Sequence, residues 1–174
     1  MITRAITTLS AFVLTISSCY ANIWHTAYQN DEMRGTAQKY NQNDSENKVN
    51  FEFPYNGGSS MSIVLRSKKI ELKEGQKPED LVPTEAMLVI SKGQFLCSSF
   101  SECHVSVKFD NEKVQKFSMG GAADGSSNVI FFKNSSEFIK KLQSHKTLFI
   151  EAPFFQAGDQ QFKFTIDGYS PLQK

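Results

Sequence analysis

Three cysteines are the residues of this sequence with the most defined chemistry. Cys97 and Cys103 lie six positions apart, and Cys19 stands alone near the N-terminus. Two thiols at this spacing could form a disulfide, hold part of a metal site or supply a nucleophile. Zinc would need a second ligand pair, and none follows. A catalytic thiol would need a positioned base, but His104 directly follows Cys103 and would point to the opposite face of a strand. We therefore predict a Cys97–Cys103 disulfide.

A disulfide implies an oxidising compartment, and the first 21 residues resemble a secretory signal peptide. Arg4 gives a positive start, residues 5–16 carry no charge, and residues 19–21 (Cys-Tyr-Ala) offer a small-x-small cleavage pattern before Asn22. This interpretation predicts a signal peptide over residues 1–21 and a periplasmic or secreted protein. Its cleavage would leave two cysteines, an even number that suits one disulfide.

A second interpretation uses the same leader. Residues 16–19 (Ile-Ser-Ser-Cys) resemble a bacterial lipobox, in which Cys19 would carry a lipid and become the mature N-terminus. That processing predicts an outer-membrane-tethered lipoprotein. We favour cleavage after Ala21, and contact with a membrane is predicted only if Cys19 is lipidated.

Histidines and carboxylates form no recognisable catalytic or metal-binding pattern. His25, His104 and His145 fall in three different elements, and the carboxylate pairs Asp31-Glu32 and Glu79-Asp80 fall in predicted turns. Phosphate-binding glycine motifs and a nucleophile elbow are also missing. We therefore predict no metal and no cofactor, and we favour a non-catalytic protein. Glycosidase carboxylates are set apart by the fold and not by the sequence, so an envelope hydrolase with carboxylate chemistry stays an alternative.

The charge pattern bears on the class of partner. The chain has 19 basic and 18 acidic residues, a formal net charge of +1, and no basic run. A nucleic-acid partner is therefore not expected.

Aromatic residues divide into two groups. Most of the 15 phenylalanines alternate within apolar segments and can build a core. Trp24, Tyr28, Tyr55 and Phe100 lie in or near polar segments, and we take them as a candidate binding surface. The alternative is that they cover the open end of the sheet as core or rim.

Residues 103–110 give the clearest structural signal. Cys103, Val105, Val107 and Phe109 alternate with polar residues, which is typical of a half-buried strand. With residues 94–97 before it, this strand predicts a hairpin whose mouth is closed by the disulfide.

The remaining segments predict the other elements. Residues 36–50 are polar and predict a solvated edge strand, residues 68–83 a surface excursion, and residues 84–90 a central strand. Residues 135–145 predict the one helix of the body, capped by Asn134. Eight or more short strands with one short helix predict a mainly β protein. We expect an antiparallel β-sandwich or open barrel, forming a single domain over residues 22–174.

Five motifs spread over most of the mature chain carry a resemblance: Trp24-x3-Tyr28-x2-Asp31-x-Met33-x-Gly35, Phe53-Pro54-Tyr55-x-Gly57-Gly58, Gly93-Gln94-Phe95-x-Cys97, Cys103-x-Val105-x-Val107-x-Phe109-Asp110 and Phe162-x-Phe164-x-Ile166-x-Gly168. Together they resemble small exported bacterial proteins, some linked to mobile elements or secretion-system loci. The C-terminal half is distantly similar to accessory proteins of the type VI secretion apparatus. The resemblance implies an exported β-sandwich, and it supplies no catalytic residue.

We therefore expect an exported accessory protein that acts through contact with a protein partner in the bacterial envelope. An envelope hydrolase would instead require two carboxylates, or a His–carboxylate pair, at working distance in a cleft. A structural lipoprotein would require Cys19 as the mature N-terminus.

Overall fold

Twelve strands, one α-helix and one 3-10 turn make up the described part of the computed structural model, residues 24–97 and 103–172. The strands are β1 (His25–Asp31), β2 (Thr36–Asp44), β3 (Val49–Phe51), β4 (Gly57–Ser59), β5 (Met61–Arg66), β6 (Ile70–Glu71), β7 (Glu85–Ile90), β8 (Cys103–Phe109), β9 (Gln115–Gly121), β10 (Val129–Phe132), β11 (Thr147–Phe154) and β12 (Gly158–Thr165). The helix α1 spans Ser135–Leu142, and the 3-10 turn η1 spans Pro78–Asp80.

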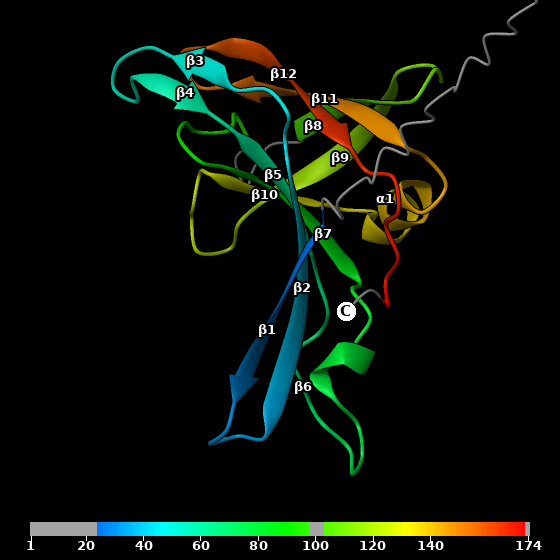
Figure 1. Ribbon diagram of the computed structural model, residues 1–174. Coiled ribbons are helices and arrows are strands. Elements are labelled where there is room, and N and C mark those ends of the chain that lie inside the picture. The colour runs from blue at the N-terminus through cyan, green and yellow to red at the C-terminus, as the bar shows by residue number, and fades with distance from the viewer. Residues whose placement is uncertain (1–23, 98–102, 173–174) are drawn as a thin grey trace, which may run out of the picture.

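Ten of these strands form one antiparallel sheet in the order β1-β2-β5-β7-β10-β9-β8-β11-β12, with β6 beside β2 (Figure 1). β3 and β4 pair separately. The large sheet curls, so that β12 approaches the end of β2 and the residues after it. The Asn43 side-chain amide donates to the Thr165 carbonyl (2.9 Å), and the Glu46 amide donates to the Lys163 carbonyl (2.8 Å). The predicted class, a mainly β, sandwich-like antiparallel fold with one short helix, is confirmed.

Phenylalanine rings fill the space inside the curled sheet. Phe109 on β8 and Phe162 and Phe164 on β12 are fully buried, together with apolar side chains of β5, β7 and β11. Each large apolar side chain buried in this way stabilises the fold by roughly 1.5–3 kcal/mol. The predicted central strand of residues 84–90 is confirmed as β7, which lies between β5 and β10 and buries residues on both faces.

The helix α1 covers one end of this core. Asn134 caps it as predicted, because its side-chain oxygen accepts a hydrogen bond from the Glu137 amide at 3.3 Å. Phe138, Ile139 and Leu142 form its buried face, and the Phe138 ring stacks on Phe132 with ring centroids 3.8 Å apart. The short helix is therefore held on the sheet by the packing of its one buried face, and in particular by aromatic contact.

The predicted disulfide is present, but the predicted hairpin is wrong. Cys97 and Cys103 are bonded, with 5.2 Å between their Cα atoms. Residues 94–97 do not pair with β8, because β9 and β11 occupy both edges of that strand. Residues 94–96 instead pair with the end of β11: the Leu96 amide donates to the Pro153 carbonyl, and the Phe155 amide donates to the Gln94 carbonyl, both at 2.9 Å.

The disulfide therefore joins two pieces of one interrupted strand line. Residues 94–96 run antiparallel to the last residues of β11, and β8 continues in the same direction along the earlier part of β11. The bond links the end of the segment 94–97 to the first residue of β8.

The predicted solvated edge strand is also wrong. β2 is an interior strand that pairs with β1 on one side and with β5 and β6 on the other. Its inward face buries Ala37, Lys39, Asn41 and Asn43, each no more than 1% exposed. The polar sequence predicts a solvated strand, but the side-chain nitrogens of Lys39, Asn41 and Asn43 donate hydrogen bonds inside the protein.

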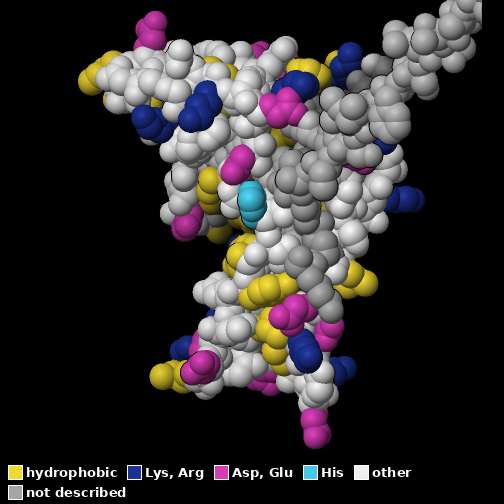
Figure 2. Space-filling view, viewed as in Figure 1, with side chains coloured by type: hydrophobic (Ala, Val, Ile, Leu, Met, Phe, Trp, Pro, Cys, Tyr) yellow, Lys and Arg dark blue, Asp and Glu magenta, His cyan; other side chains and the backbone are white. Residues whose placement is uncertain are grey.

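β1, β2, β6 and η1 extend away from the rest of the molecule, and we call residues 25–44 and 68–83 the arm (Figure 1). The rest of the described residues form the body. Figure 2 shows the arm as a narrower projection with acidic, basic and hydrophobic side chains on its surface. The predicted surface excursion of residues 68–83 is thus one side of the arm.

The leader predicted over residues 1–21, including Cys19, lies outside the described residues. Within the described residues, no helix has the length and apolar character needed to cross a membrane.

Candidate functional site

The aromatic residues predicted to form a binding surface are not brought together. Trp24 is only 3% exposed, packs on Tyr169 with ring centroids 4.6 Å apart, and donates from Nε1 to the Ile166 carbonyl. The expectation that Trp24 lies on an exposed surface is therefore wrong, because its ring is part of the hydrophobic core.

The other three predicted positions lie apart from one another. Tyr28 is half-buried on β1, directly opposite Lys39. Tyr55 is half-buried in the turn between β3 and β4, where its ring meets Phe51. Phe100 lies outside the described residues. Tyr28 and Tyr55 thus belong to the arm and the body respectively, and no common surface contains them.

A His–carboxylate pair is present at the C-terminal end of α1. His145 Nε2 lies 3.1 Å from Glu112 Oε1, and His145 Nδ1 lies 2.8 Å from the Lys141 carbonyl. Both ring nitrogens are therefore engaged with the protein itself, and the ring packs on Phe109. Because no nitrogen is left to exchange a proton with a substrate, the pair joins α1 to the turn after β8 and does not resemble a catalytic dyad.

The surroundings of His145 favour its charged form. Burial alone would lower the pKa of the imidazole. The hydrogen bonds to Lys141 and Glu112, with the negative charges of Glu112 and Asp110, outweigh burial, so the pKa of His145 is raised. The hydrogen bond from His145 in turn lowers the pKa of Glu112.

Lys39 is the buried titratable group that the sequence did not reveal. It is 0% exposed, and its Nζ donates to the carbonyls of Glu79 and Pro171, both at 3.1 Å. Its backbone amide donates to Ser67 Oγ at 2.9 Å, and the Ser67 amide donates to the Lys39 carbonyl at 2.9 Å. One side chain thus joins β2, η1 and the C-terminal residues.

Burial lowers the pKa of Lys39, and the carboxylates of Glu79 and Asp80 act in the opposite direction. Burial and the charge of Glu79 also raise the pKa of the nearby Tyr28 phenol. Perturbed pKa values of this kind occur at active sites as well as in structural networks. Here the ammonium has no exposed surface through which a substrate could reach it. Lys39 therefore has a structural role, in which its side chain holds β2, η1 and the C-terminal residues together.

Within the described residues, no group of three histidine, cysteine or acidic side chains is arranged to hold a metal ion. The accessible feature with the most defined geometry is instead a hollow on the outer face of β8, β11 and β12.

The register of these three strands sets the side chains around the hollow. Phe149 on β11 lies directly between Lys108 on β8 and Lys163 on β12. Two residues further along β11, Glu151 lies between Ser106 and Gln161. Because alternate residues of a strand share a face, all of these side chains point away from the core.

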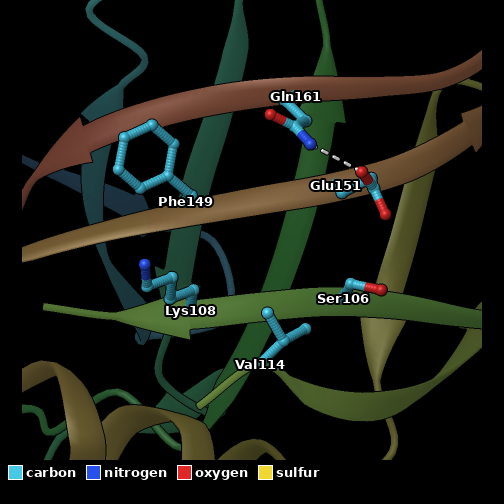
Figure 3. Close-up of a pocket in the computed structure, with 6 residues that line it drawn as sticks. All are labelled: Ser106, Lys108, Val114, Phe149, Glu151 and Gln161. Atoms are coloured by element: carbon cyan, nitrogen blue, oxygen red, sulfur yellow. Dashed lines mark hydrogen bonds between the residues drawn. The ribbon is translucent and has the colours of Figure 1, made fainter. Parts of the chain in front are cut away.

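The hollow has a volume of about 270 Å³ and is lined by Ser106, Lys108, Val114, Phe149, Glu151 and Gln161. Figure 3 shows Phe149 and Lys108 on one side and Ser106, Glu151 and Gln161 on the other. The short Ser106 side chain leaves space among longer neighbours, which explains the hollow. Gln161 Nε2 donates to Glu151 Oε2 at 2.7 Å and holds that carboxylate in place.

Apolar side chains are unusually accessible on this face. Phe149 is 40% exposed and Val114 63% exposed. Along the same side of β11, Phe155 follows at 45% exposure, beside Leu96 at 52%. Six residues of strand separate the two phenylalanines, a span of about 20 Å. We call the residues around the hollow, with Leu96 and Phe155, the β11 face.

Sequence reasoning missed this face, although one signal was present. Residues 147–155 (Thr-Leu-Phe-Ile-Glu-Ala-Pro-Phe-Phe) carry apolar side chains at positions of both parities, so burying Leu148 and Ile150 leaves Phe149 on the outside. The chemistry that the face allows is recognition, since it combines a fixed aromatic ring, a hollow and separated charges.

Comparison with protein-family models, with curated proteins and with solved structures finds no match to this chain. The resemblance to small exported bacterial proteins stays a prediction.

Proposed function

We propose that this chain is an exported, non-catalytic binding protein of the bacterial envelope, and that it contacts a protein partner through the β11 face. The observation that carries the proposal is Phe149, an aromatic side chain 40% exposed on β11, between β8 and β12 and beside a hollow. Exposed aromatic residues set on regular secondary structure are typical anchors of protein interfaces.

The Cys97–Cys103 bond supports the location. Disulfides persist in exported proteins and are rare in reducing cytosol. The signal peptide over residues 1–21 is part of the same proposal. A periplasmic or secreted protein would start at Asn22, whereas lipidation at Cys19 would make it a tethered lipoprotein.

Site-specific photocrosslinking in the envelope tests the interface. A photoreactive phenylalanine analogue replaces Phe149 in one variant and the exposed Lys73 of the arm in a control variant. We expect one discrete adduct from position 149 and none from position 73. Adducts from position 73 alone, or from neither position although both variants are exported, would contradict the proposal.

Intact mass of the purified protein, before and after reduction, tests the compartment. A start at Asn22 with a gain of two hydrogens is expected. A diacylglyceryl addition at Cys19 would replace the free periplasmic protein with a lipoprotein, and an unprocessed chain with free thiols would contradict export.

A further inference from the structure

Three lysines on the outer face of neighbouring strands have no partner among the described residues; Lys108 lines the hollow, and Lys116 and Lys133 lie on the strands beyond it. Lys108 on β8, Lys116 on β9 and Lys133 after β10 are all exposed, and their ammonium groups make no ion pair or hydrogen bond with any described residue. Some lysines of the body are paired, such as Lys163 with Glu46 at 2.7 Å, whereas the ammonium groups of Lys48, Lys113 and Lys140 have no ion pair or hydrogen bond with the described residues. Lys108, Lys116 and Lys133 are set apart because neighbouring strands place them on one face of the sheet.

The strand register places these lysines close together. Ser106 pairs with Lys116, which puts Lys116 diagonally across from Lys108, a separation of about 7–8 Å. The Lys133 amide donates to the Ser118 carbonyl, so Lys133 lies beside the same strand β9. Like charges at such distances repel one another, and an anionic partner would relieve that repulsion.

The acidic groups nearby offset only part of this charge. Glu112 pairs with His145 and Lys141, whereas Glu137 and Glu151 accept hydrogen bonds from the neutral amides of Asn134 and Gln161 and keep their negative charge. Three lysines against these two carboxylates leave a formal local excess of one positive charge. The whole chain carries a formal net charge of only +1, so this positive charge is a local feature. We call Lys108, Lys116 and Lys133 the lysine cluster.

Resting on the function proposed above, we propose that the partner presents an acidic segment with an apolar side chain beside its carboxylates. The carboxylates lie over Lys108 and Lys116, and the apolar side chain enters the hollow against Phe149 and Val114. Long-range attraction from the lysine cluster speeds the encounter, and the apolar contact provides the specific fit.

The position of Glu151 favours a peptide over an anionic lipid surface. Its carboxylate lies across the hollow from Lys108 (Figure 3) and would repel a continuous layer of negative headgroups. A peptide can instead place a backbone N–H or a basic side chain at Glu151 while its carboxylates meet the lysines. The hollow of about 270 Å³ also has the size for one or two side chains and not for a membrane.

Fluorescence anisotropy with the oxidised, full-length protein tests this inference. The probe is a labelled decapeptide of alternating glutamate and leucine, compared with a lysine–leucine peptide and a glutamate–serine peptide. We expect binding of the glutamate–leucine peptide alone, weakened by added salt. The double variant Lys108→Glu/Lys116→Glu should bind it at least about tenfold more weakly. The matched control Lys68→Glu/Lys73→Glu, on the arm, should bind it unchanged.

Several outcomes would overturn the inference. If the lysine–leucine peptide binds as tightly as the glutamate–leucine peptide, acidic side chains are not required. If the glutamate–serine peptide binds as tightly, apolar side chains are not required. Binding of vesicles rich in anionic lipid without binding of the peptide would assign the cluster to a membrane. This inference can fail while the proposed function holds. In that case Phe149→Ser abolishes crosslinking from position 114 in the envelope, whereas the lysine variants do not. The β11 face would then be an interface, and its partner would not be acidic. If no variant changes crosslinking, both fail.

Discussion

In the body, β8 and β12 turn valine and phenylalanine side chains inward, whereas in the arm β2 turns a lysine and two asparagines inward. Both sets are almost completely buried. The body gains its stability from apolar surface removed from water. The arm must instead provide a hydrogen-bond partner for each polar group that it buries, since an unpaired one is unfavourable by roughly 1–3 kcal/mol.

The arm meets this demand for its side-chain nitrogens by linking elements far apart in the chain, while Thr36 Oγ1 and Asn41 Oδ1 stay buried without a hydrogen bond to the described residues. Lys39 reaches Glu79 and Pro171, Asn41 donates to Thr26 at 2.9 Å, and Asn43 donates to Thr165. The comparison teaches that two neighbouring parts of one sheet can have different kinds of interior. Apolar packing sets the overall stability of the body, and directed hydrogen bonds set where the arm lies.

The largest effect should come from the core of the body. Phe162 is fully buried and its ring lies 6.0 Å from that of Phe154. We expect Phe162→Ala to lower the free energy of unfolding by about 3–5 kcal/mol, measured by urea denaturation. Phe149→Ala, on the neighbouring strand but facing outward, is the control and should change it by less than about 1 kcal/mol. Equal losses for the two variants would remove the distinction between core and face.

A smaller and more local effect is expected in the arm. Lys39→Met keeps the length of the side chain but removes the donor to Glu79 and Pro171, while it also removes the penalty of burying a charge. The free energy of unfolding should fall by less than about 2 kcal/mol. Hydrogen exchange should speed up at residues 78–81 and 169–172, and Lys108→Met should leave it unchanged. Two outcomes would contradict this local structural role of Lys39. One is a fall in the free energy of unfolding as large as that of Phe162→Ala, and the other is unaltered exchange in both segments.

The smallest effect concerns pH and the one His–carboxylate pair of the described body. Because the pKa of folded His145 is raised, protonation stabilises the folded state. This contribution is complete below the unfolded pKa of about 6.5 and disappears as the pH rises through the raised folded value. Urea midpoints should therefore fall slightly over that window, and Glu112→Gln should flatten the dependence. A midpoint that rises with pH in the same window would have the wrong sign for this mechanism.

Elements whose apolar pattern is local were predictable from sequence. The alternation of Val105, Val107 and Phe109 identified β8, the Asn134 cap and the Phe138 face identified α1, and two cysteines identified the disulfide. In each case the residue types of the segment itself indicate which of its side chains are buried.

The polar interior of the arm was not predictable in this way. Lys39, Asn41 and Asn43 have the period of a strand but the chemistry of a solvated one. Their burial depends on acceptors at residues 26, 79, 165 and 171, which only the folded chain brings near.

The lysine cluster and the β11 face were hidden for a similar reason. Lys108, Lys116 and Lys133 are scattered along the sequence, which shows no basic run. They form a cluster because β8 pairs with β9 and β9 with β10. Phe149 falls between two lysines because β11 pairs with both β8 and β12.

The Cys97–Cys103 bond also separates loop length from strand register. The two cysteines close a covalent ring with the residues between them. Backbone pairing along β11 and β9 sets the register of β8, so the number of residues in that ring does not set it. Doubling the length of a closed loop costs only about 0.6 kcal/mol more. The sequence between the two cysteines is therefore a place where a foreign peptide could be inserted without redesigning the scaffold.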